Sequence, residues 1–283
     1  MCDFRTMSLL EKMYQMRPCL GSPHRVRIDK VRVPMLMVQF TPPGRESTVR
    51  RIAKRLLSLE VAHQNFSTRF SSNTASDALR RDDAYWRSSN RDLLHPLSEK
   101  LLQIQVSARR STRDFNDERN LAERARHSLG GRKRLNGAEL AAWLCEVNAH
   151  TGARGAGHIR GLDVFTSHDT RGMRCAFCPP SDLSRQLDLL SLTLDEWGDY
   201  PCFRAILLLV GILAIHPFID GNGRTARACF NAILEGPPSF SAIPLRTIFD
   251  CSDGGFEIRL RDAVFNGSWG PLVSYFTTAI DHC

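Results

Sequence analysis

Apolar residues recur with helical spacing over much of this 283-residue chain. In STVRRIAKRLLSL, residues 47 to 59, they return every three or four positions with basic residues opposite, which predicts an amphipathic helix. Leucines with the same spacing predict a second helix from Leu183 to Leu194. The most apolar run, Ala205 to Ile215, has 11 residues. A membrane span needs about 20, so this run predicts a buried core helix that begins near Pro201.

Further helices are expected from the same pattern and from capping signals. Residues 92–128 have a helical pattern, and Asn136 followed three residues later by Glu139 has the spacing of a capping box, which predicts another helix start. A helix is expected over 224–234, before a Gly-Pro-Pro stop. Within the last 45 residues, FEIRLRDAVF and PLVSYFTTAI predict two more helices.

Strand signals are few. The stretch VRVPMLMVQF is short and β-rich, and LDVFTSHDTRGMRCAF has two short runs around a turn at residues 169–172, which predicts a hairpin over about 164–176. The Gly-rich GARGAG, residues 152 to 157, lacks the lysine of a phosphate-binding P-loop, so we interpret it as a connector. The expected fold class is mostly α, a helical bundle with one short hairpin.

Charge divides the chain unevenly. Residues 1–134 contain 27 Lys and Arg against 14 Asp and Glu, whereas residues 135–283 contain 11 against 16. The basic half could favour nucleic acid, an acidic membrane surface or an acidic protein partner. However, the Arg-rich segment near residue 115 alternates in sign and has few aromatic residues, which is typical of a solvated helix face. We therefore expect no nucleic acid and no membrane among the partners.

The cysteines and the first residues bear on the compartment. The nine cysteines are scattered, and Cys175 and Cys178 form a C-x-x-C without the second pair that a structural zinc site needs. MCDFRTMSLLEKM contains no long apolar run of the kind found in a secretory leader. We expect reduced thiols and a cytoplasmic protein, with delivery into another cell as an effector left open.

The segment HPFIDGNGRTAR, residues 216 to 227, follows the apolar run directly. Gly221 and Gly223 flank Asn222, so successive backbone N–H groups can form a concave nest for an anion at the start of the next helix. Arg224 and Arg227 are three residues apart, on one face of the first turn. Two arginines beside such a nest fit a polyphosphate better than a single carboxylate.

Two more residues of this segment suggest chemistry. Asp220 beside a phosphate site is a suitable ligand for Mg²⁺. His216 is neutral near pH 7 and suited to removing a proton from a hydroxyl. Taken singly, His216 could simply cap a helix end and Asp220 could simply form a turn. Together they indicate phosphoryl or nucleotidyl transfer.

The same segment resembles the Fic-domain signature HPFx[D/E]GNGRxxR at every specified position. The resemblance extends over about residues 100 to 283 and divides the chain into a basic, partly helical region of unknown role, 1–95, and a Fic-like catalytic domain, 96–283. It implies a Fic-type helical bundle whose hairpin is a flap. It also implies an adenylyltransferase that moves AMP from ATP to a Ser, Thr or Tyr hydroxyl of a target protein.

The resemblance also implies a role for each motif residue. His216 would be the catalytic base, and Asp220 would hold Mg²⁺. The remaining residues would bind the phosphates of ATP: Gly221, Asn222, Gly223, Arg224 and Arg227. The hairpin near residues 164–176 would align the target protein by strand addition.

Several alternatives stay open on sequence alone. Doc-type kinases replace the first motif glycine, so Gly221 favours AMP transfer over phosphorylation, whereas UMP transfer or an inactive Fic-like binding module also fits the motif. Many Fic proteins are restrained by a helix reading [S/T]-x-x-x-E-[G/N], whose glutamate pairs with the second motif arginine. The only Glu followed by Gly or Asn is Glu235, which has Asn231 four positions before it and falls in the helix after the motif, not in an inhibitory position. We therefore expect either a separate inhibitor protein, similar to an antitoxin, or an unrestrained toxin or effector.

Overall fold

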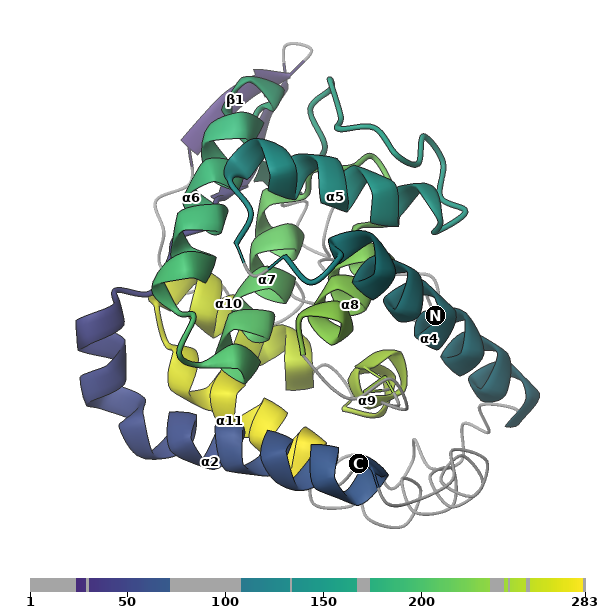
Figure 1. Ribbon diagram of the computed structural model, residues 1–283. Helices are drawn as coiled ribbons and strands as arrows, with labels where there is room; N and C mark the ends of the chain where they lie inside the picture. The colour runs from purple at the N-terminus through teal and green to yellow at the C-terminus, as the bar shows by residue number, and fades with distance from the viewer. Residues whose placement is uncertain are drawn as a thin grey trace.

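The computed structural model describes residues 24–28, 31–71, 108–132, 134–166, 174–234, 242–243, 245–252 and 255–281, most of them helical (Figure 1). The helices are α2 (Arg45–Ser71), α4 (Ala108–Leu129), α5 (Gly137–Ala149), α6 (Leu183–Glu196), α7 (Pro201–Ile215), α8 (Asn222–Ile233), α9 (Leu245–Cys251), α10 (Gly255–Asn266) and α11 (Trp269–Asp281). The strands are β1 (His24–Ile28), β2 (Val31–Val38) and β3 (Arg174–Phe177). The predicted fold class, mostly α, is confirmed.

Helix α7 lies at the centre of the bundle. Every residue from Ala205 to Ile215 is buried, because α8, α6, α2 and α10 pack around the helix (Figure 1). A helix that is apolar on all sides is stable only when it is covered on all sides. The prediction of a buried core helix is therefore confirmed. None of the helices among the described residues is both long enough and apolar enough to cross a membrane.

Helix α2 contributes to the same core as the C-terminal helices. It packs along α11 and against α7, and its Leu56 and Leu59 are fully buried. Its Glu60 carboxylate accepts hydrogen bonds from the backbone N–H groups of Cys202 and Phe203, at 3.1 and 3.2 Å. These N–H groups have no acceptor within the first turn of α7, so Glu60 caps that helix. Part of the predicted 1–95 region thus supports the helix that precedes the motif.

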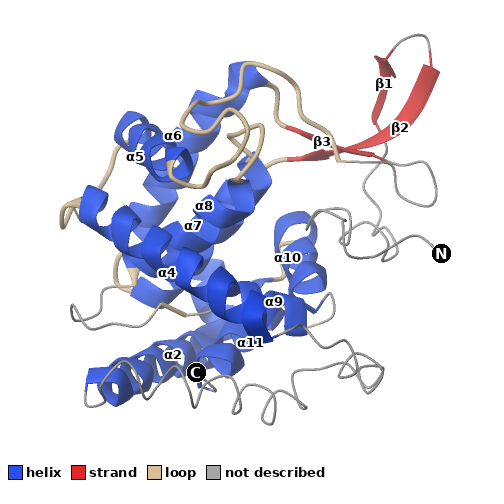
Figure 2. Ribbon diagram, turned by 90° about the vertical axis from the view of Figure 1, so that its right-hand side faces the viewer, coloured by secondary structure: helices blue, strands red, loops and turns tan. Residues whose placement is uncertain are grey.

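The strands lie at one corner of the bundle (Figure 2). β1 pairs with β2 antiparallel, and β2 pairs with β3 parallel, with Val38 opposite Phe177. The predicted hairpin is confirmed in part: Phe165 forms a single antiparallel bridge with Ala176, so its first arm is not a full strand. The turn predicted at residues 169–172 lies outside the described residues. β3 therefore has a neighbour along both of its edges.

Most of the other predicted elements are present. The capping box is confirmed, since the Asn136 side chain accepts the Glu139 N–H and the Glu139 carboxylate accepts the Asn136 N–H, at 2.9 and 2.8 Å. α8 begins at Asn222, two residues earlier than expected, because the Thr225 N–H already bonds to the Gly221 carbonyl. The pattern did not predict α9. Of the helix expected over 92–128, residues 92–107 lie outside the described part.

Candidate functional site

The site begins where α7 ends. His216 has φ 54° and ψ 59°, and it is the only non-glycine residue with positive φ among the described residues. A left-handed conformation costs an L-residue roughly 1–2 kcal/mol, so the surrounding contacts must hold it. Pro217 follows and cannot continue the helix. The chain therefore turns sharply between the core helix and α8.

The imidazole of His216 is half-buried against β3. Its ring stacks on Phe177, with centroids 4.1 Å apart and planes 18° from parallel. Nδ1 is buried. Burial lowers the pKa of His216 to about 4, and the nearby positive charge of Arg160 acts in the same direction. The ring is therefore neutral at physiological pH, as a proton acceptor must be.

The turn after His216 is closed by the side chain of Asn222. Its amide oxygen accepts the Phe218 N–H at 3.0 Å, and its amide nitrogen donates to the Phe218 carbonyl at 2.8 Å. Phe218 itself is fully buried in the core. Asn222 thus fixes the shape of the turn through its side chain and can offer only its backbone N–H to an anion.

The positive end of α8 opens onto this turn. Gly221 precedes the helix with φ 83°, and the Asp220 carboxylate accepts the Gly221 N–H at 2.5 Å. The first N–H groups of a helix have no acceptor within it and carry the positive end of the helix dipole. A helix N-terminus of this kind generally favours an anion, and anion binding at this turn stays a prediction.

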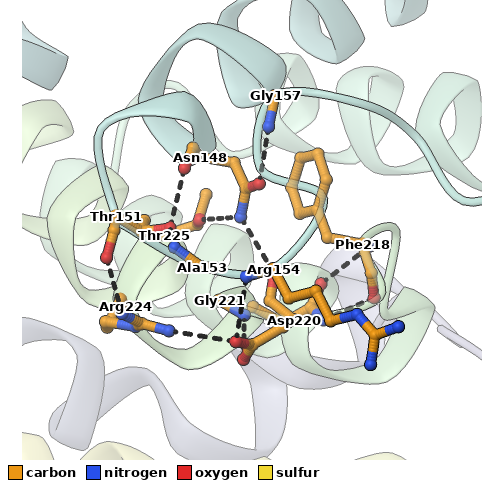
Figure 3. A network of polar contacts seen from close by, with 11 residues as sticks. Asn148, Thr151, Ala153, Arg154, Gly157, Phe218, Asp220, Gly221, Arg224 and Thr225 are labelled. Carbon is orange, nitrogen blue, oxygen red and sulfur yellow. Dashed lines mark hydrogen bonds and ion pairs between the residues drawn. The ribbon is translucent and has the colours of Figure 1, made fainter.

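Asn148, at the end of α5, ties the motif to the Gly-rich loop (Figure 3). Its amide nitrogen donates to the Asp220 carbonyl at 3.2 Å and to the Thr225 hydroxyl at 3.0 Å, and its amide oxygen accepts the Gly157 N–H at 2.9 Å. The 152–157 segment is a connector, as interpreted, but it also lies against the motif. No local signal in the sequence singles out Asn148, because its partners lie up to 77 residues away.

Arg224 is joined to the same loop. It donates to the Thr151 carbonyl at 2.5 Å and forms an ion pair with Asp220 at 3.3 Å (Figure 3). The backbone N–H of Arg154 also approaches the Asp220 carboxylate, at 3.4 Å. The Arg224 and Asp220 side chains are 42% and 52% exposed, so both remain accessible to a ligand.

Arg227 contacts helix α4 and the start of α8. Its Nη1 is 3.4 Å from the point where a Cβ on Gly223 would stand, so its guanidinium lies beside the start of α8. Its Nε donates to Glu118 of α4 at 2.8 Å. Only 11% of the Arg227 side chain and 7% of the Glu118 side chain are exposed. The two motif arginines therefore contact different parts of the structure, Arg224 near the surface beside the loop after α5 and Arg227 buried beside α4.

Glu118 is held firmly and was not predicted. Its second oxygen accepts the Arg246 N–H at 3.2 Å. Burial raises the pKa of Glu118, and the charge of Arg227 opposes that shift. Glu118 is followed by Arg119, so it does not match the inhibitory pattern sought in the sequence. A glutamate nevertheless contacts the second motif arginine, from a helix that the pattern does not identify.

A sequence profile of the Fic/DOC family matches residues 139–234, from the first turn of α5 to the end of α8. These residues are a Fic/DOC family domain. The "Protein adenylyltransferase Fic" of Nematostella vectensis is 36% identical to the chain over 91 residues, which cover 31% of this chain and 20% of that protein. The chain thus matches only about a fifth of that relative's length.

A solved structure agrees with this Fic domain at the level of fold. A Fic family protein from Desulfovibrio desulfuricans G20 superposes with a TM-score of 0.58 at 16% sequence identity. The superposition covers 86% of this chain and 74% of that chain. It therefore extends well beyond residues 139–234 and shows that the surrounding helices share the arrangement.

Asp220 is the residue predicted to hold Mg²⁺, and it lies at the surface beside the start of α8. In the described part of the chain, no group of three or more His, Cys, Asp or Glu side chains converges. Mg²⁺ commonly takes one or two carboxylates and completes its shell with phosphates and water. An exposed carboxylate at the mouth of an anion-binding turn suits that mode of binding.

We expect a side chain at position 221, in the turn of the Fic domain, to lower the free energy of unfolding strongly. A Cβ on Gly221 would stand 2.7 Å from the Asn148 amide and 2.8 Å from the Thr151 hydroxyl. Backbone strain and crowding together should lower the free energy of unfolding by about 2–4 kcal/mol in Gly221→Ala. Gly152 also has positive φ but has open space around it. In urea titrations Gly152→Ala should therefore cost only about 1 kcal/mol, and equal costs would contradict the crowding.

Proposed function

We propose that this protein is an adenylyltransferase, which transfers AMP from ATP to a Ser, Thr or Tyr hydroxyl of a target protein and releases pyrophosphate. One observation carries the proposal: in a Fic/DOC family domain, a neutral imidazole stands beside a helix N-terminus that Arg224 and Arg227 flank. The helix end and the arginines suit a polyphosphate, and the imidazole suits a hydroxyl that must lose a proton.

The phosphates of ATP would occupy the turn. The backbone N–H groups of Asn222 and Gly223 would bind them, with Arg227 beside Gly223 on the outer phosphates. The Gly221 N–H would join them once it leaves the Asp220 carboxylate. Asp220 would hold Mg²⁺, which would neutralise phosphate charge when bound. ATP and Mg²⁺ would have to separate Arg224 from Asp220. Because that pair is exposed, the separation should cost less than about 1 kcal/mol.

The reaction needs one proton acceptor and one leaving group. The hydroxyl oxygen attacks the α-phosphorus of ATP, and the bond from that phosphorus to the bridging oxygen of pyrophosphate breaks. The hydroxyl proton passes to His216. Since Nδ1 of His216 is buried, Nε2 is the atom that accepts the proton. The products are the AMP-modified protein, pyrophosphate and a protonated His216.

The packing around Gly221 favours AMP transfer over phosphorylation. In Doc-type kinases, which depart from the Fic signature that this motif resembles, a larger residue replaces this glycine. Here Asn148, Thr151 and Ala153 occupy the space that such a side chain would need, since all three would lie within 3 Å of its Cβ. Position 221 therefore has room only for glycine, the residue that the resemblance associates with transfer from the α-phosphate. Another nucleotide, such as UTP, would use the same turn.

A target strand would dock on the flap. β3 pairs with β2 along one edge and with Phe165 along the other, so we infer that the target adds to the outer side of residues 164–166. Exposed Leu162 and Ile219 offer apolar contacts for it. Strand addition orders the target backbone through unpaired N–H and C=O groups. A separate inhibitor protein stays a prediction.

The cysteines favour the cytoplasm as the compartment. Among the described residues, the free thiols are Cys145, Cys175, Cys178, Cys202 and Cys229. Free thiols persist in reducing compartments.

The test uses ATP labelled at either end. Purified protein is incubated with Mg²⁺ and a cell lysate, once with label at the α-phosphate and once at the γ-phosphate, with a heat-unfolded sample as control. We expect protein-bound label from the α-position alone. Label from the γ-position alone would replace the proposal with phosphorylation. Label from α-labelled UTP but not ATP would change the nucleotide, and nucleotide binding without transfer would favour a binding module.

A further inference from the structure

Arg160 is buried beside the site, although no local sequence pattern predicts its burial. It lies between the Gly-rich loop and the flap, and only 2% of its surface is exposed. Among the described residues no carboxylate makes a salt bridge with it. Its partners are instead backbone carbonyls. A buried charge needs such partners, because an unpaired one is costly.

The carbonyls that Arg160 binds belong to the end of α7. Its Nε donates to the His216 carbonyl at 2.7 Å, and its backbone N–H donates to the Pro217 carbonyl at 2.9 Å. One Nη also approaches the Ile215 carbonyl at 3.5 Å. The last carbonyls of a helix lack partners within it and form the negative end of its dipole. Arg160 therefore stabilises the chain where His216 takes its left-handed conformation.

The other guanidinium nitrogens bind the flap. One donates to the Cys178 carbonyl at 2.5 Å, directly after β3, and the other donates to the Leu162 carbonyl at 2.9 Å. Cys178 follows Phe177, whose ring stacks on His216. Arg160 thus joins both walls of the imidazole site, the end of α7 and the end of β3, through one planar group.

We propose that Arg160 is a positioning residue for His216: it fixes the His216 backbone and the Phe177 wall so that the imidazole faces the substrate. Its positive charge also adds to the effect of burial, which lowers the pKa of that ring. This rests on the proposed adenylyl transfer. Arg160 contacts neither the anion-binding turn from Gly221 to Gly223 nor the motif arginines, so it should affect the chemical step and leave ATP binding unchanged.

Arginine suits this role better than lysine. Its planar fork directs several N–H donors at once toward carbonyls on different segments, whereas a lysine ammonium is a single point on a flexible stem. Arg160→Lys keeps the charge and loses the fork, and Arg160→Gln loses the charge as well. The two variants separate geometry from electrostatics.

The experiment measures AMP transfer, nucleotide affinity and the titration of His216 in the full chain. For Arg160→Lys we expect kcat to fall about 10- to 100-fold, as for a misplaced reacting group, with KM for ATP changed less than about twofold. In Arg160→Gln the NMR titration midpoint of His216, assigned from the signal lost in His216→Gln, should rise from about 4 toward the ordinary histidine value near 6.5. The other charge that acts on this ring, Asp220, is unchanged in both variants.

Three results would overturn the proposal: wild-type transfer in Arg160→Lys, an unchanged His216 midpoint in Arg160→Gln, or loss of cooperative urea unfolding in Arg160→Lys. The last would mean that Arg160 only maintains the fold. If the wild-type chain transfers no AMP, the proposed function fails by itself, and the His216 titration still tests the electrostatic part of the inference.

Discussion

Replacing Glu118 with alanine should lower the free energy of unfolding by about 3–5 kcal/mol, because removing one partner of a buried ion pair leaves the other charge buried without compensation. Arg227 would lose its Glu118 contact at 2.8 Å, with only 11% of its side chain exposed. The backbone N–H of Arg246 would lose an acceptor at the same time. Urea titration monitored by circular dichroism measures the change.

A matched control lies on the same helix. Glu123 pairs with Arg119 at 2.9 Å, nearly the same distance, but this pair is on the surface. Exposed pairs contribute about 0–1 kcal/mol, so Glu123→Ala should cost less than about 1 kcal/mol. Equal costs for the two substitutions would contradict the assigned burial of the Glu118 pair.

The double variant Glu118→Ala/Arg227→Met asks whether the loss arises from the unpaired charge. It should be more stable than Glu118→Ala alone, because no charge is then left without a partner. It should also bind ATP weakly, since Arg227 stands beside Gly223 at the proposed phosphate site. If the double variant is less stable than Glu118→Ala alone, the Arg227 side chain stabilises the fold by packing, and the loss in the single variant does not arise from an unpaired charge.

Local sequence signals predicted the elements whose cause is local. The 11-residue apolar run required burial, and the Asn136 and Glu139 side chains required a helix start between them. The turn after His216 was predictable because Gly221 and Gly223 allow conformations closed to other residues. In each case the physical cause lies within a few residues of its effect, so the pattern itself contains it.

The contacts that complete the site have no local cause. Glu118 reaches Arg227 across 109 residues, and Arg160 reaches His216 across 56. In sequence, Glu118 belongs to a segment of alternating charges, which indicates a solvated face. Its burial depends on α4 packing against α8 and α9, which only the tertiary structure determines. Charge patterning alone therefore cannot separate a buried glutamate from an exposed one.

His216→Ala should lower the rate of AMP transfer by about 10²- to 10⁴-fold, the range that a positioned general base contributes. Because burial lowers the pKa of His216 to about 4, the wild-type rate should stay nearly constant from pH 8 down to about pH 5. An unshifted histidine would lose half its activity near pH 6.5. Rates of label transfer at saturating ATP between pH 4 and 8 measure this directly.

The lowered pKa of His216 also makes the stability of the fold depend on pH, and this dependence provides a control. In the unfolded chain His216 is protonated as the pH falls through about 6.5, whereas in the folded chain it is protonated only near pH 4. Neutral His216 therefore contributes stability that is complete above pH 6.5 and is lost as the pH falls toward 4. Urea titration at each pH must show that the protein remains folded where the rate is measured. His127→Ala, at an exposed position on α4, should leave the transfer rate unchanged. A wild-type rate that falls by half near pH 6.5 while the protein stays folded would contradict a neutral base with a lowered pKa.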